Sequence, residues 1–167
     1  MMKRILYLIT GLICALTVKA QSDCFFTHYS SEDGLSQTTV MGILQDRKGN
    51  MWFATWNGLN KFDGYSFKVY KARFGNQVAL TNDRMDQIFE DKLGFLWLQA
   101  YDNHAYRFDP RTEQFERVPA ENEPGSGAAI TSIHVLPSGS VWLLTENEGA
   151  LRVTTGSTTC RLATTRY

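Results

Sequence analysis

The sequence lacks an excess of charge of either sign, because 17 basic residues balance 17 acidic ones among its 167 residues. It therefore has no basic stripe of the kind that nucleic-acid surfaces use, and we expect no nucleic acid among its partners. It also lacks any long apolar run after residue 20, so no later segment has the length of a membrane-spanning helix. A hydrophobic content of 43% excludes a disordered chain and indicates a globular one.

The familiar marks of catalysis and metal binding are missing as well. The sequence contains no nucleophile elbow, no phosphate-binding loop and no dinucleotide fingerprint. His28, His104 and His134 do not pair on one element as metal ligands would, and "DRKGN" lacks the oxygen ligands of a calcium loop. We predict no catalytic residue, no metal and no cofactor, although 17 acids leave a carboxylate pair open by number alone.

Cysteine is scarce, and whether the cysteines can form a disulfide depends on whether the first twenty residues direct export. "MMKR", the apolar run "ILYLITGLICALTV" and a small residue at Ala20 predict a secretory signal peptide over residues 1–20. An uncleaved anchor is the alternative, and a lipoprotein signal at Cys14 is disfavoured by the bulky Ile13 before it. Cleavage would leave 14 basic and 17 acidic residues. Export would permit a disulfide between Cys24 and Cys160, which their spacing neither supports nor excludes.

What the sequence does contain is a repeat. "LQDRKGNMWFAT" returns as "FEDKLGFLWLQA" and, more degraded, as "VLPSGSVWLLTE", with a period of 45 residues. That period places three tryptophans and three glycines in register: Trp52, Trp97, Trp142, Gly49, Gly94 and Gly139. A period of this length is typical of a repeat architecture.

Each copy contains four short β-forming segments. The first has "TTVMGILQ", "MWFAT", "LNKFD" and "SFKVYK"; the second has "RMDQIFE", "FLWLQA", "AYRFD" and "QFERV"; the third has "ITSIHVL", "SVWLLT", "ALRVT" and "TCRLAT". Four strands with tight turns form an antiparallel meander. The second segment is apolar on both faces, so each sheet needs a cover on each side.

These features predict an all-β fold, a partial β-propeller of about three four-stranded antiparallel blades, in which neighbouring blades cover each other. We place a lead-in or strand at residues 21–33 and the blades at 34–75, 76–122 and 123–167. In the turns, Asp46 and Asp91 are expected to accept backbone amides, Gly49, Gly94 and Gly139 to take a positive φ, and the tryptophans to fill the space between blades.

The turns between the second and third segments are the candidate ligand sites. They lie at the end of the blades opposite the D-x-x-G turns and combine aromatic rings with amides and carboxylates, which suits a sugar. The candidates are Trp56, Asn57, Tyr101, Asp102, Asn103, His104, Glu146 and Asn147. The alternative is that these residues serve only the tight turns.

The stretch from His28 to Lys71 resembles the opening of a two-component regulator propeller. The family phrases D-G-L-S, D-x-x-G-x-x-W and G-L-x-x-F/Y-D-G match Asp33–Ser36, Asp46–Trp52 and Gly58–Gly64. The resemblance weakens in the second copy, where His104 replaces the Gly58 equivalent and Ala105 the Leu59 equivalent. It weakens further in the third, where Leu136 stands at the Asp46 position and Thr154 at the Asp63 position.

The resemblance implies the periplasmic sensor region of a hybrid two-component histidine kinase and response regulator. In that family two seven-bladed propellers and a small β-sandwich precede a transmembrane helix anchored in the inner membrane, followed by a histidine kinase, a receiver and an AraC-like DNA-binding domain. It implies a non-catalytic fragment, with an oligosaccharide or glycan fragment and the remaining blades as partners. The alternative is the start of an exported polysaccharide lyase or glycosidase, and a plain interaction scaffold is a third possibility.

Three blades do not close a ring, since propellers need four or more. We therefore expect the isolated chain to be poorly soluble or to self-associate through exposed blade edges.

Overall fold

The computed structural model describes residues 3, 24–72, 80–119, 127–155 and 160–164; at residues 154–155 and 160–164 it describes only the course of the backbone. The predicted signal peptide, apart from residue 3, lies outside the described residues. In the described part of the chain, no helix is long and apolar enough to cross a membrane.

Three antiparallel four-stranded sheets make up the fold. In each sheet consecutive strands are neighbours, so each is a simple meander. The first contains β1 (Val40–Gln45), β2 (Met51–Thr55), β3 (Gly58–Phe62) and β4 (Phe67–Tyr70); the second β5 (Met85–Glu90), β6 (Leu96–Ala100), β7 (Ala105–Asp109) and β8 (Gln114–Val118); the third β9 (Ile130–Val135), β10 (Val141–Thr145), β11 (Ala150–Thr155) and β12 (Cys160–Thr164). The predicted all-β fold of three four-stranded blades is confirmed.

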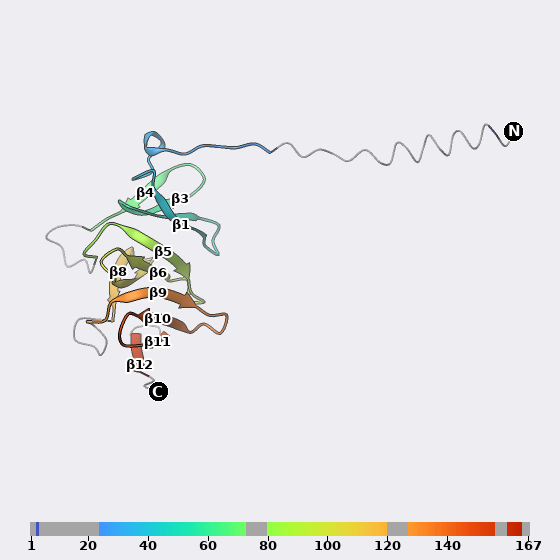
Figure 1. The fold of residues 1–167 in the computed structure, drawn as a ribbon. Helices are drawn as coiled ribbons and strands as arrows, with labels where there is room; N and C mark the ends of the chain where they lie inside the picture. The colour runs from blue at the N-terminus through green and yellow to red at the C-terminus, as the bar shows by residue number, and fades with distance from the viewer. Residues whose placement is uncertain (1–2, 4–23, 73–79, 120–126, 156–159, 165–167) are drawn as a thin grey trace.

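The sheets lie one beyond another, with the second in the middle (Figure 1). Contacts between sheets concentrate on the first strands, since β1 contacts β5 and β5 contacts β9. Gly42 in β1 permits this approach: a Cβ there would lie 3.0 Å from Ile88 Cγ2. A larger residue would push the first two sheets apart.

Two apolar layers fill the spaces between sheets. The first contains Trp52, Leu59, Tyr70, Met85, Leu96, Leu98 and Phe108, and the second contains Trp97, Ala105, Ile133, Val141, Leu143 and Val153. Strand β6 contributes Leu96 and Leu98 to one layer and Trp97 to the other, as strand alternation requires. Every residue of β6 is buried, which explains why its sequence is apolar on both faces.

The lead-in to the first sheet is a short 3-10 helix, Ser31–Asp33, and no strand occurs within residues 24–33. Asp33 accepts hydrogen bonds from the Ser30 amide and hydroxyl, and Gly34 follows at φ 104°. The next residue but one, Ser36, accepts a hydrogen bond from the buried Asn60 amide of β3 at 2.8 Å. The D-G-L-S segment is thereby joined to the third strand of its own sheet.

Candidate functional site

The stack of sheets has two ends with different chemistry. One end carries the turns that join the first and second strands of each sheet, which have the D-x-x-G pattern in the first two copies. The other carries the turns between the second and third strands, beside the segments that lead into each first strand. Because the strands are antiparallel, these two sets of turns lie at opposite ends.

At the D-x-x-G end, Asp46 is the centre of a buried hydrogen-bond cluster. Its Oδ1 accepts the backbone amides of Lys48 and Asn50 at 2.9 Å. Its Oδ2 accepts the indole N–H of Trp52 at 2.8 Å. Burial opposes the ionised form, but the hydrogen bonds from Trp52, Asn50 and Lys48 together lower the pKa of Asp46 below its ordinary value. The carboxylate therefore stays charged although it is buried.

The second copy repeats this cluster and the third does not. Asp91 accepts the amides of Leu93 and Phe95 and the indole N–H of Trp97 at 2.9 Å. In the third copy Leu136 stands at the aspartate position, and Trp142 is only partly buried. The bond between the carboxylate and the indole is one that the sequence analysis does not predict, although the constant spacing of six residues between Asp and Trp was a signal for it.

The glycines of these turns take the left-handed backbone conformation. Gly49, Gly94 and Gly139 have φ of 87°, 84° and 92°. In this region a side chain is disfavoured.

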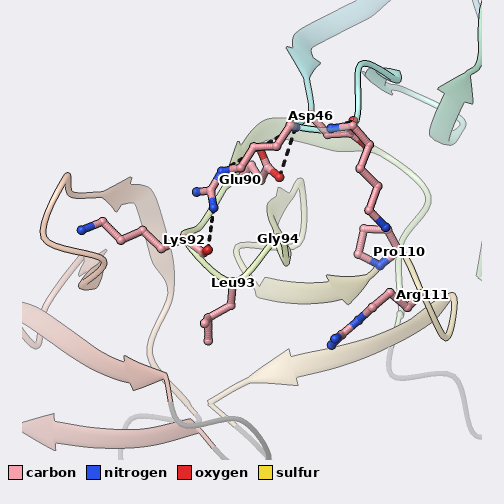
Figure 2. A pocket seen from close by; sticks show the side chains of 9 residues that line it. Asp46, Glu90, Lys92, Leu93, Gly94, Pro110 and Arg111 are labelled. Atoms are coloured by element: carbon pink, nitrogen blue, oxygen red, sulfur yellow. Dashed lines mark hydrogen bonds and ion pairs between the residues drawn. The ribbon is translucent and has the colours of Figure 1, made fainter.

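Successive D-x-x-G turns are also joined to each other. Arg47 donates through Nη2 to the Asp91 carbonyl at 2.8 Å and through Nη1 to the Lys92 carbonyl, and its backbone amide donates to Glu90. Figure 2 shows these groups lining a shallow pocket between the first two sheets, with Arg111 on its far side. Arg111 is held by Asp109. Arg47 and Arg111, two cationic side chains of this pocket, are thus engaged in holding turns together.

At the opposite end, the candidates of the first copy behave differently from each other. Asn57 donates its side-chain amide to the Ser36 carbonyl at 3.1 Å, so it holds its own turn. Trp56 is 44% exposed. Its backbone amide donates to the Thr39 carbonyl, which joins the turn to the segment before β1.

Trp56 and Tyr101 both lie close to the guanidinium group of one arginine, Arg84. The Cζ atom of Arg84 is 4.4 Å from the centre of the Trp56 ring and 4.0 Å from the centre of the Tyr101 ring. Arg84 also donates through Nε to Asp86 at 3.3 Å. Tyr101 is 58% exposed. We call these three side chains, Trp56, Arg84 and Tyr101, the guanidinium cluster; it lies at the junction of the first two sheets.

Arg84 is a site residue that sequence reasoning missed. The backbone bonds Trp56 to Thr39, Tyr101 to Arg84 and Glu146 to Ala129 are equivalent in the three copies, each joining an amide to the carbonyl 17 residues before it. Position 84 therefore corresponds to Thr39 and Ala129, and only the second copy carries a long cation there. That departure from the repeat was the available signal.

The other candidates of the second copy are engaged within the protein. Asp102 accepts the hydroxyls of Thr81 and Tyr106, and its Oδ1 lies 3.4 Å from Nδ1 of His104. Burial is the main reason that the pKa of Tyr106 is raised. Asn103 has φ 61°, and its carbonyl accepts the Ile130 amide from the third sheet at 2.7 Å. These residues shape the turn and connect it to the next sheet.

The third copy contributes little to the guanidinium cluster. Glu146 and Asn147 are exposed, and the backbone amide of Glu146 donates to the Ala129 carbonyl. Of the eight candidates, the structure unites Trp56 and Tyr101 around one cation. Among the described residues, no group of three or more His, Cys, Asp or Glu side chains is arranged to hold a metal ion. Cys24 is exposed, and the side chain of Cys160 lies outside the described residues, so the structure does not test whether the two cysteines pair.

Residues 34–57 match the family model described as a two component regulator propeller. This match spans the D-G-L-S segment from Gly34 onward, the Asp46 cluster and the exposed Trp56. The first copy of the repeat is thus similar to a two-component regulator propeller repeat.

Similar proteins agree with this propeller assignment. Over 58 residues, 34% of this chain, it is 48% identical to histidine kinase P4 of Formosa agariphila, and it spans 4% of that protein's length. The fold is similar to the crystal structure of the extracellular domain of a protein assigned as a hybrid two component system from B. thetaiotaomicron, with a TM-score of 0.64 and 25% identity. That match covers 76% of this chain and 18% of the crystallised one.

A propeller enzyme shares the fold. Virginiamycin B lyase from Staphylococcus aureus matches with a TM-score of 0.54 and 18% identity, over 74% of this chain and 40% of the lyase. At that identity the likeness concerns the fold alone.

Proposed function

We propose that this chain is part of the ligand-sensing propeller of a hybrid two-component sensor, and that its own role is binding rather than catalysis. The observation that carries the proposal is the likeness, over three quarters of the chain, to an extracellular domain of a protein assigned as such a system. The relative named as a histidine kinase supports the same role. The remaining blades of the parent receptor are then its structural partners, and the parent is anchored in the inner membrane with this region in the periplasm.

The ligand we propose is an oligosaccharide or glycan fragment, and the response is expression of glycan-utilisation genes. The turn end beside the first strands supports this, because it exposes Trp56 and Tyr101 at a junction of two sheets. Exposed aromatic rings stack on sugar rings, while neighbouring polar groups bind hydroxyls. Occupancy at a junction between blades would shift the equilibrium between two packings of the receptor.

The test uses the full-length receptor and its host. A glycan array probed with the receptor identifies ligands, and transcript levels of the host are then compared with and without each ligand, in the parent strain and in a strain lacking the gene. We expect a bound glycan to induce a set of genes only when the receptor is present. Binding without any gene response would contradict the sensory role, and loss of intact ligand after incubation, measured by mass spectrometry, would favour the exported enzyme instead.

A further inference from the structure

The guanidinium cluster places two aromatic rings against one arginine that solvent still reaches. The centres of the Trp56 and Tyr101 rings lie 4.4 and 4.0 Å from Cζ of Arg84. The side chain of Arg84 is nevertheless 32% exposed. The group therefore has aromatic neighbours and remains accessible to a ligand.

Among the described residues, the terminal nitrogens of Arg84 have no hydrogen-bond acceptor. Its hydrogen bond to Asp86 involves Nε, and none of the hydrogen bonds in the described part of the chain involves Nη1 or Nη2 of Arg84. Arg47, at the other end, spends both terminal nitrogens on backbone carbonyls of the next sheet. An arginine whose role was only to join two sheets would donate hydrogen bonds from its terminal nitrogens to the neighbouring sheet, as Arg47 does. Arg84 instead keeps the N–H groups of Nη1 and Nη2 available as donors.

Contacts on Arg84 restrain its guanidinium group. Two aromatic rings lie against it and its Nε donates to Asp86, so less side-chain entropy remains to be lost on binding than for an unrestrained arginine. Asp102, in the turn that carries Tyr101, already accepts the hydroxyls of Thr81 and Tyr106. A planar fork with two free N–H groups matches the two oxygens of a carboxylate or sulfate, and such bidentate bonds are strong and orientation-specific.

We propose that Arg84 binds an oxyanion carried by an acidic oligosaccharide, while Trp56 and Tyr101 pack against its sugar rings. This inference rests on the proposed glycan-sensing function. A uronate carboxylate and a sulfate ester present the same pair of oxygens, so the shared chemistry is an anionic group on a saccharide. Neutral glycans would leave the donor pair of Arg84 unmatched and would bind more weakly.

The experiment presents the full-length receptor to an array of uronate-containing, sulfated and neutral oligosaccharides. The variants are Arg84→Gln, which removes the charge, and Arg84→Lys, which keeps the charge but loses the bidentate fork. Arg111→Gln is the matched control, because Arg111 is an exposed arginine held by an aspartate at the opposite end of the sheets. Thermal melting verifies that each variant is folded.

We expect the wild-type receptor to bind either the uronate-containing or the sulfated oligosaccharides more tightly than the neutral ones. Comparing these two acidic sets identifies whether Arg84 binds a carboxylate or a sulfate. Both Arg84 variants should weaken that binding by about 10- to 100-fold, and the control should leave it unchanged. Preference for neutral glycans by the wild type would overturn this inference and leave the proposed function standing, as would acidic binding that both Arg84 variants retain. Absence of binding to every glycan would overturn the glycan role itself.

Discussion

At the scale of single residues, the aspartate of a D-x-x-G turn has two structural roles. Asp46 accepts turn amides through one oxygen and the indole of Trp52 through the other. It therefore ties the conformation of a hairpin turn to the orientation of the large side chain that fills the space between sheets. A buried carboxylate is tolerated here because its oxygens are satisfied by N–H donors.

We predict that Asp46 and Trp52 are energetically coupled. Asp46→Asn places an amide N–H₂ opposite the indole N–H, and Trp52→Phe removes the indole donor, so the double variant should lose less stability than the sum of the two singles. We expect a coupling energy of about 1 to 2 kcal/mol in a double-mutant cycle measured by denaturant unfolding.

The third copy supplies the control for that cycle. Trp142 is partly buried and has Leu136 where the other copies have aspartate, so the pair Leu136→Ala and Trp142→Phe should show coupling near zero. Additive losses for Asp46 and Trp52 would show that the hydrogen bond between them contributes nothing to stability.

At the scale of the strand and turn, glycines of similar φ serve different purposes. Gly49 has φ 87°, and a Cβ added there would meet nothing within 4 Å. Gly58, at the start of β3, has φ 113°, and a Cβ there would lie 2.6 Å from the Tyr70 carbonyl oxygen. Gly49 is required by backbone conformation, whereas Gly58 is also required by the close approach of the end of β4.

We predict that Gly49→Ala costs about 1 to 2 kcal/mol, the strain of a left-handed residue. Gly58→Ala should cost at least about 1 kcal/mol more, because the backbone of β4 must move as well. Urea unfolding of the two variants at unchanged m-value measures the difference. Equal losses of unfolding free energy in the two variants would mean that the backbone of β4 moves without cost. The close contact between Gly58 and the Tyr70 carbonyl would then not constrain the sequence.

At the scale of the whole molecule, the three sheets differ in how well they are covered. The middle sheet has neighbours on both sides, and β6 is buried throughout. On the first sheet Met41 and Ile43 are 45% and 62% exposed, and on the third sheet Leu144 is 37% exposed. Met41 and Ile43 alternate along β1 with Gly42 and Leu44, which face the second sheet, so the exposed pair lies on the outer face.

We predict that residues 21–167, produced without any further partner, self-associate through these outer faces. Size-exclusion chromatography with light scattering at several protein concentrations should show mass increasing with concentration. Replacing Met41 and Ile43 with threonine should reduce the association, because threonine keeps β propensity and removes apolar area. A stable monomer with a sharp melting transition at high concentration would contradict the prediction.

Much of this architecture follows from the order of residues along the chain. The 45-residue period, the alternating apolar segments and the Asp–Gly turns are local signals, and each acts over a few neighbouring residues, so the three meanders and their strands were predictable. The exposed Trp56 and Tyr101 could also be chosen as candidates, because turn positions follow from the strands.

The site itself depends on distances that no local pattern encodes. Trp56 and Tyr101 meet on Arg84 because stacking the first two sheets aligns equivalent positions of consecutive repeats, and the cation at position 84 has no counterpart in the other copies. The separate roles of Asn57, which holds its own turn, and Asp102, which is engaged by Thr81 and Tyr106, likewise arise from side-chain packing across segments. Repeat spacing specifies which strands form, whereas contacts between sheets specify which side chains remain free to bind.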